Sequence, residues 1–256
     1  MTAPRDIATA LTFLTRLPVA RFASGEPAAL SRATTWFPLV GLLIGSALGL
    51  AVIGLSSLLP APFAVIAVLV LGVVLTGGFH EDGLADVADS AGAFALDSKL
   101  SIMRDSRVGT YGALALILLL LARYAVLGDL VWTDWTLVLG ALIAAHVLAR
   151  WSSVLLMTWL PYARAEAANK VVAQGVTSTQ LLLSSAVVAV CLIPVAVLEW
   201  PLAVLAVPVA LAVTALAGLW FRRSFGGITG DCLGAANVLI EISILLTALT
   251  LHVSSL

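Results

Sequence analysis

Long apolar stretches constrain this chain of 256 residues more than any other feature. A helix needs about 20 apolar residues to cross the roughly 30 Å of hydrocarbon in a bilayer. Seven segments approach this length, and they cover residues 36–58, 63–79, 110–127, 135–160, 181–198, 202–221 and 233–253. A hydrophobic share of 61% and a charged share of 11% exclude a water-soluble domain. We therefore predict an all-α, polytopic membrane bundle of about seven helices, with residues 1–256 forming one domain.

The distribution of Lys and Arg predicts which ends of these helices face the cytoplasm, where positive residues are retained. They lie at alternate ends of the segments, at Arg5, Arg16, Arg21, Arg32, Lys99, Arg104, Arg107, Arg164, Lys170, Arg222 and Arg223. The opposite loops hold Asp129, Asp134 and Glu199 but no Lys or Arg. We expect a cytoplasmic amino terminus, a short helix over residues 7–19 at the membrane surface, and any active site on the cytoplasmic face.

Charge and cysteine content narrow the classes of partner. A net charge of -1 provides no basic surface for nucleic acid, so we expect none as a partner. Cys191 and Cys232 are the only cysteines, which makes a disulfide framework improbable. Membrane lipid is the expected surrounding, and the sequence leaves open whether the chain forms a homo-oligomer.

The densest polar segment covers residues 77–90 and contains His80, Glu81, Asp82, Asp86 and Asp89. In a helix, Asp82, Asp86 and Asp89 fall within an arc of roughly 60°. Carboxylates so close repel one another unless a cation lies among them, and hard oxygen ligands suit Mg²⁺ or Mn²⁺. Glu81 is a further candidate ligand, although helical geometry turns it and His80 away from this face. The alternative is a solvated acidic surface.

A second polar segment, residues 103–112, directly precedes the third apolar stretch. Arg104 and Arg107 can share a face, and Ser106 with nearby backbone amides adds donors, which together favour a phosphate clamp. Anchoring by positive residues at the membrane explains the two arginines equally well, but it does not explain Asp105 and Ser106.

The third polar segment starts at residue 226 and runs into the last apolar stretch. Thr229 and Asp231 precede this stretch, and Asp231 could simply cap its helix. Asn237 and Glu241 continue as a polar face two to three turns inward, where an unpaired carboxylate is costly. Arg150, in the fourth stretch, is the expected partner. We give less weight to Arg123, which can extend to the surface, and to His146, which can be an interior histidine.

These three segments resemble the signature segments of the cobalamin synthase family, the adenosylcobinamide-GDP ribazoletransferases. The resemblance rests on residues 77–86 with Asp89, residues 103–107 with Gly109 and 111–112, and residues 226–231 with 234–235 and Glu241. It also includes residues 14–18 and 36–38, and so spans nearly the whole chain.

The resemblance implies a reaction and a location. α-Ribazole or its 5′-phosphate would attack the phosphate nearest the cobinamide in adenosylcobinamide-GDP, releasing GMP and giving adenosylcobalamin or its 5′-phosphate, with Mg²⁺ required. Asp82, Asp86 and Asp89 would be metal ligands. The general base would be one of these carboxylates, with Asp82 as the first candidate, and His80 would be the second candidate. The enzyme would lie in the inner membrane of a prokaryote. Part of the acidic segment also resembles CDP-alcohol phosphotransferases, although Asp86 stands where that family has Arg.

Two other functions remain open at this point. In a secondary transporter, Glu241, Asn237 and Arg150 would form an ion path across the bilayer. A CDP-alcohol-type phospholipid synthase would share the metal chemistry but not the corrinoid substrate. The concentration of polar residues at one membrane surface favours an enzyme at the interface over a path through the membrane.

Overall fold

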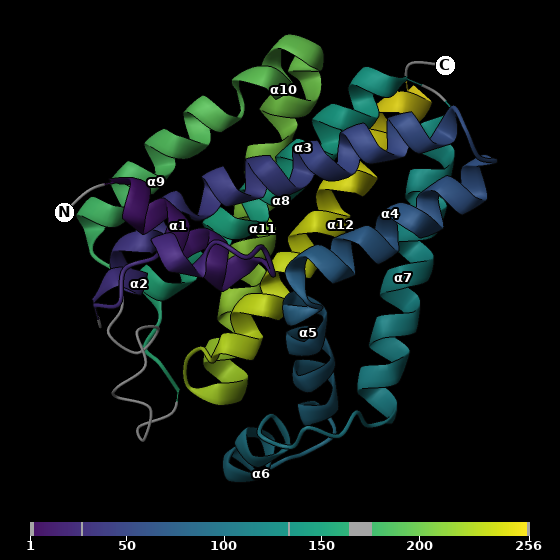
Figure 1. The fold of residues 1–256 in the computed structure, drawn as a ribbon. Coiled ribbons are helices and arrows are strands. Elements are labelled where there is room, and N and C mark those ends of the chain that lie inside the picture. Colours follow the sequence, from purple (N-terminus) through teal and green to yellow (C-terminus); the bar gives the residue numbers. More distant parts are fainter. Residues whose placement is uncertain (1–2, 27, 133, 164–175, 255–256) are drawn as a thin grey trace.

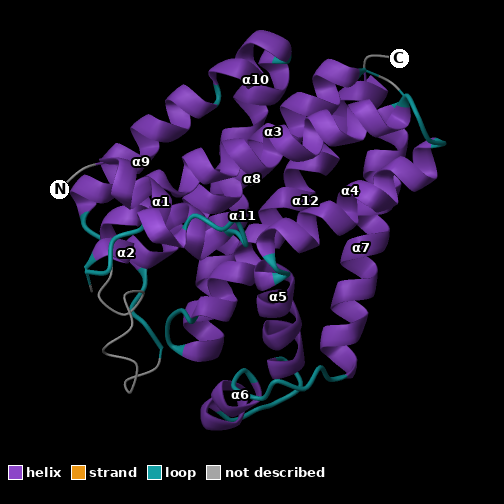
Figure 2. Cartoon of the chain, in the orientation of Figure 1, coloured by secondary structure: helices purple, strands orange, loops and turns teal. Residues whose placement is uncertain are grey.

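The computed structural model describes residues 3–26, 28–132, 134–163 and 176–254, and helices without any β-strand make up this part of the chain (Figures 1 and 2). The α-helices are α1 (Ala3–Leu14), α2 (Ala29–Ala33), α3 (Phe37–Ser56), α4 (Ala61–Thr76), α5 (Phe79–Ser90), α6 (Leu96–Ile102), α7 (Thr110–Val131), α8 (Trp135–Trp159), α9 (Ser178–Cys191), α10 (Ile193–Leu198), α11 (Trp200–Phe225) and α12 (Gly230–Ser254). Two short 3-10 helices, η1 (Ala20–Phe22) and η2 (Thr34–Trp36), join the first elements.

The predicted all-α membrane bundle is confirmed. Within the described ranges, six helices are long and apolar enough to cross a membrane, and the bent pair α4 and α5 gives a seventh if it counts as one span. The cytoplasmic position of the amino terminus stays a prediction. Arg164 and Lys170, which contributed to it, lie outside the described residues.

The second apolar stretch differs from its predicted form, because α4 ends at Thr76 and the chain turns by 89° before α5. Gly77 and Gly78 make this turn with φ of +72° and +67°, a region that favours glycine. A Cβ on Gly77 would also lie 2.1 Å from Nε of Arg16. Phe79, predicted to end the span, instead begins α5, and the acidic segment forms a separate helix that lies beside α7 and above α6 in Figure 1.

Helix α8 lies at the centre of the bundle and is buried along almost its whole length. It packs closely against α3, where Gly41, Gly45 and Gly49 recur every four residues. A Cβ on Gly41 would lie 2.3 Å from the carbonyl oxygen of His146, so only glycine permits this approach. Small residues at such spacing let membrane helices pack backbone to backbone. This close packing of α3 on α8 holds His146 and Arg150 deep in the bundle.

The amino-terminal helix, Ala3–Leu14, begins and ends earlier in the chain than the predicted surface helix over residues 7–19. Helix α1 ends at Leu14, and a turn follows in which the Thr15 hydroxyl accepts a hydrogen bond from the Leu17 amide at 3.3 Å. Its Ala8, Ala10 and Leu14 are buried, and α1 packs on α2 and α3. This contact places α1 against the end of the bundle where the polar segments meet.

Candidate active site

The three polar segments of the sequence lie against one another, with α5 in the middle. Helix α5 meets the start of α12 closely, since a Cβ on Gly83 would lie 2.7 Å from the Asp231 carbonyl oxygen. Gly234 is similarly close to the backbone of His80, where a Cβ would lie 3.3 Å from Cα. The paired glycines bring the acidic helix and the last helix into backbone contact.

The other side of α5 meets the loop before α7 through Asp89. Its two carboxylate oxygens accept hydrogen bonds from the amides of Gly109 at 2.7 Å and Gly112 at 2.8 Å. A Cβ added to Gly109 would lie 2.5 Å from the Asp89 carboxylate, and a Cβ added to Gly112 would lie 2.3 Å from it. Asp89 therefore caps the start of α7 from a neighbouring helix, and it ties the segment of Arg104 and Arg107 to α5.

The acidic face of α5, formed by Asp82, Asp86 and Asp89, has the predicted helical arrangement. Asp82 is exposed, Asp86 and Asp89 are partly buried, and His80 points to the buried side of the helix. Among the described residues, no three His, Cys, Asp or Glu side chains are grouped closely enough to hold an ion by themselves. Mg²⁺ in phosphate-transfer sites is typically bound by one or two carboxylates together with substrate phosphates. Asp82 and Asp86 fit that smaller ligand set.

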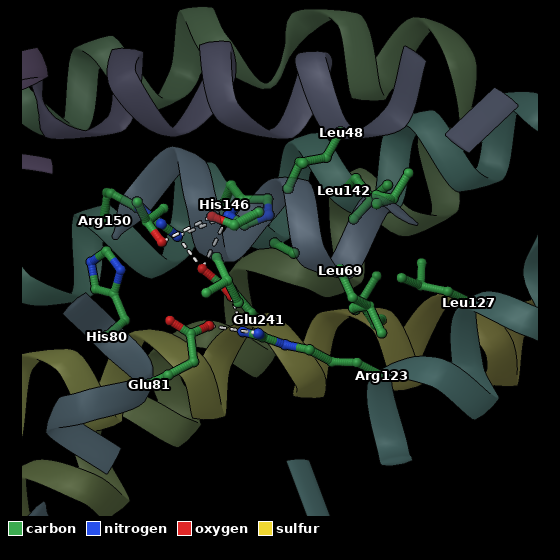
Figure 3. Close-up of a pocket in the computed structure, with 16 residues that line it drawn as sticks. Leu48, Leu69, His80, Glu81, Arg123, Leu127, Leu142, His146, Arg150 and Glu241 are labelled. Atoms are coloured by element: carbon green, nitrogen blue, oxygen red, sulfur yellow. Dashed lines mark hydrogen bonds and ion pairs between the residues drawn. The ribbon is translucent and has the colours of Figure 1, made fainter. Parts of the chain in front are cut away.

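A second group of charges, the interior network, lies inside the bundle and consists of Glu81, Arg123, His146, Arg150 and Glu241 (Figure 3). Glu241 is at its centre, because Arg123 and Arg150 both donate hydrogen bonds to its carboxylate. Nδ1 of His146 lies 3.0 Å from Oε1 of Glu241. Arg123 also donates to Glu81 at 2.7 Å. The expected pairing of Arg150 with Glu241 is present, and it joins α8 to α12.

The sequence interpretation of Arg123 was wrong, whereas that of His146 was confirmed. Arg123 does not extend to the surface, since it is 8% exposed and joins Glu241 on α12 to Glu81 on α5. His146 is an interior histidine, as expected, and its partners are Arg150 and Glu241. An ionisable residue in the middle of an apolar helix marks an interior pairing, and this signal was available in the sequence of α7. Glu81, a candidate metal ligand, lies in this network.

A cavity of about 40 Å³ adjoins the interior network, with apolar side chains of α3, α4 and α7 on its other walls. Oε2 of Glu81 and Nε of Arg150 are buried without a hydrogen-bond partner among the described residues. The space is sufficient for one or two water molecules, which commonly satisfy such groups.

The residues predicted to form a phosphate clamp lie at the surface, in the loop between α6 and α7. Arg107 is exposed and donates from Nε to Asp105 at 2.9 Å. The side-chain and backbone hydrogen bonds from Arg107 lower the pKa of Asp105 to about 2, so this carboxylate stays ionised. Arg104 and Ser106 are exposed in the same loop. The side chain of Asp105 therefore positions Arg107.

The start of α12 corrects one detail. Thr229, not Asp231, caps the helix, because its hydroxyl accepts a hydrogen bond from the Cys232 amide at 3.3 Å. Asp231 lies in the first turn of the helix. Further along, Asn237 is buried and donates to Ser153 Oγ at 2.7 Å. The polar face of α12 thus continues from the surface to Glu241.

Known proteins resemble this chain over almost its full length. Residues 6–249 match the family described as Cobalamin-5-phosphate synthase. A protein of Shewanella amazonensis named adenosylcobinamide-GDP ribazoletransferase is 39% identical over 249 residues, which cover 94% of each chain. Proteins of the same name from Shewanella woodyi and Shewanella baltica are each 36% identical and cover 91% of this chain. No solved structure matches it. The chain belongs to the cobalamin-5-phosphate synthase family.

Proposed function

We propose that this protein is an adenosylcobinamide-GDP ribazoletransferase. It joins α-ribazole or α-ribazole 5′-phosphate to adenosylcobinamide-GDP and yields adenosylcobalamin or its 5′-phosphate together with GMP. The names of the relatives support this assignment and support neither a transporter nor a phospholipid synthase. The convergence of the three polar segments around α5 is the structural observation that carries it.

The reaction breaks a phosphoanhydride bond and forms a phosphate ester bond. A ribose hydroxyl of α-ribazole attacks the phosphorus nearest the cobinamide, the bond from that phosphorus to the bridging oxygen breaks, and GMP leaves with that oxygen. The hydroxyl proton passes to a general base, for which Asp82 is the first candidate and His80 the second. Asp82 comes first because it is exposed on the acidic face, whereas His80 is buried behind it.

Charge neutralisation is the main requirement of such a reaction. Asp82 and Asp86 would hold Mg²⁺, for which Mn²⁺ could substitute, and the ion would neutralise charge on the diphosphate oxygens. Arg104 and Arg107 would bind the outer phosphate oxygens, with Ser106 as a further donor. Thr229 and Asp231 would line the same site from α12.

The membrane position of the site is part of the same proposal. The acidic face would lie on the cytoplasmic side of the inner membrane, with lipid around the apolar helices, and the loops rich in Lys and Arg support this orientation. This arrangement lets water-soluble α-ribazole reach the site.

The test is an activity assay on the purified protein. Incubation with adenosylcobinamide-GDP, α-ribazole and Mg²⁺ should release GMP in step with loss of the corrinoid substrate, and EDTA should stop the release. Absence of GMP release by protein that is folded in detergent or liposomes would contradict the proposal. Ion flux in liposomes without GMP release would favour a transporter.

A further inference from the structure

Glu81 joins the acidic helix α5 to the inside of the bundle (Figure 3). Its Oε1 accepts a hydrogen bond from Nη1 of Arg123 on α7 at 2.7 Å, and Nη2 of Arg123 donates to Glu241 on α12. The side chains of Glu81 and Arg123 are 16% and 10% exposed. Salt screens an ion pair with so little exposure much less than it screens a surface pair. The pair therefore ties α5 to two helices of the bundle.

The other contacts of α5 restrain its rotation about its own axis less. Gly83 lets the backbones of α5 and α12 meet, but glycine has no side chain that could interlock with the facing helix. Asp89 is bonded to the start of α7 only in the last turn of α5. Before α5 the chain turns at residues 77–78, two glycines with a permissive backbone. In the first turn, His80 is buried by packing, whereas Glu81 is held by an ion pair.

The rotation of α5 determines where its acidic face lies. Neighbouring residues on a helix point about 100° apart, so Glu81 lies against the bundle while Asp82 is exposed. Side chains extend to roughly 5–6 Å from the helix axis, so a rotation of about 10° moves a side-chain end by roughly 1 Å. A displacement of this size can change the rate of a catalysed reaction by about a hundredfold. The contact inside the bundle is thus coupled to the carboxylate outside it.

We propose that Glu81 and Arg123 are positioning residues, whose ion pair fixes the rotation of α5 and thereby holds Asp82 and Asp86 where they bind the metal ion. This inference rests on the proposed function, which assigns Mg²⁺ to these two carboxylates. It gives Glu81 a role inside the bundle in place of the predicted role of metal ligand, since its Oε1 is bonded to Arg123 and its Oε2 is buried.

Breaking the pair from either side tests the proposal. Glu81→Ala leaves Arg123 paired with Glu241. Arg123→Gln leaves Glu241 paired with Arg150. Binding of Mn²⁺ to the full-length protein in the presence of pyrophosphate is followed by electron paramagnetic resonance. We expect binding about fivefold weaker or more in both variants, and an intermediate value for Glu81→Gln, whose amide oxygen can still accept a weaker hydrogen bond from Arg123.

The Arg123 variant distinguishes positioning from direct coordination. If Glu81 were itself a metal ligand, removal of the neighbouring cation would leave Mn²⁺ binding unchanged or make it tighter. If the pair positions α5, then Glu81→Ala, Arg123→Gln and the double variant should weaken binding to the same extent, because each breaks the same link. Wild-type binding by Arg123→Gln would overturn the proposal, and so would additive losses in the double variant.

His146→Asn is the matched control, because the partners of His146 are Arg150 on α8 and Glu241 on α12 rather than a residue of α5. This variant should lower the thermal midpoint in detergent without weakening Mn²⁺ binding. A loss of binding equal to that of Glu81→Ala would show that any loosening of the interior network disturbs the site, and it would overturn the specific role of the pair.

A milder variant decides the matter if Arg123→Gln does not fold. Arg123→Lys keeps the charge but replaces the planar fork that donates to both Glu81 and Glu241 by a single ammonium group. Weaker Mn²⁺ binding by Arg123→Lys supports the proposal, and wild-type binding overturns it.

Kinetics separate this inference from the proposed function. At saturating Mg²⁺, the kcat for GMP release should fall about tenfold or more in Glu81→Ala, whereas the KM for α-ribazole should stay within about twofold of the wild-type value. If the wild-type protein released no GMP but the variants weakened Mn²⁺ binding as stated, the proposed function would fail and the positioning role would stand. If the wild-type protein released GMP and the variants matched it in Mn²⁺ binding and turnover, the positioning role alone would fail.

Discussion

The acidic face of α5 and the interior network both contain carboxylates, but they differ in what surrounds them. Glu241 is 4% exposed and lies among Arg123, His146 and Arg150, so its charge is compensated inside the bundle. Asp82 is exposed at the end of the bundle where the polar loops meet. Burial makes the network a support for the packing of α7, α8 and α12, whereas exposure leaves the acidic face accessible to substrate and metal.

The largest expected effect separates activity from stability. Asp82→Ala and Asp86→Ala should each lower the rate of GMP release by about 1,000-fold or more, because a metal ion contributes several kcal/mol to such reactions. The protein should remain inserted with an unchanged thermal midpoint. Asp97→Ala on α6 removes an exposed carboxylate outside the site and should keep the wild-type rate. Near-normal activity of Asp82→Ala or Asp86→Ala would count against the site.

The interior network should show the opposite pattern. Glu241→Ala leaves Arg123 and Arg150 buried without their shared partner, which costs about 3–5 kcal/mol in comparable cases. Thermal unfolding in detergent measures the loss. Glu26→Ala, which breaks a surface pair with Arg32, is the control and should cost about 1 kcal/mol or less. Equal thermal midpoints for the two variants would show that the network does not support the fold.

Asp89 belongs to the acidic face, but its oxygens accept hydrogen bonds from the start of α7, so it also has a structural role. Asp89→Ala should destabilise the protein by about 1–2 kcal/mol through loss of the bonds to Gly109 and Gly112. The loss should be the same with and without Mg²⁺, as calorimetry in EDTA can measure. An Asp89→Ala protein of wild-type stability that binds Mn²⁺ less tightly would instead make this residue a metal ligand.

The smallest effect is expected at the surface loop. Arg107→Ala should raise the KM for adenosylcobinamide-GDP by about fivefold or less, since exposed ion contacts are weak. Because the pKa of Asp105 is about 2, this carboxylate is ionised throughout pH 5–9, and the effect should not vary with pH in that range. Steady-state kinetics at several pH values give the measurement. A change that follows pH would show that another group positions Arg107.

Sequence patterns predicted the parts of the structure that depend on periodicity and burial. The apolar segments, the helical acidic face and the pairing of Arg150 with Glu241 all follow from where polar residues interrupt an apolar chain. The bend at Gly77 and Gly78 was missed, because glycine permits but does not require a positive φ.

Other features depend on how helices are rotated against one another. Arg123 on α7 pairs with Glu81 on α5 and with Glu241 on α12. The direction in which its side chain points is set by the packing of α7 rather than by the sequence around it. The capping of α7 by Asp89 joins residues 20 and 23 positions apart, which no local rule connects. Asp231 was considered as the cap of α12. Thr229, two residues earlier, is an equally suitable capping residue by type, and the sequence could not distinguish the two.

Binding of Mn²⁺ to the purified protein, followed by electron paramagnetic resonance, tests the division between the two regions most directly. The wild-type protein in the presence of pyrophosphate should bind Mn²⁺ saturably, and a protein with both Asp82→Ala and Asp86→Ala should lose that binding while it keeps the wild-type thermal midpoint. Saturable binding of equal strength in both proteins would contradict the assignment of the metal to the acidic face of α5.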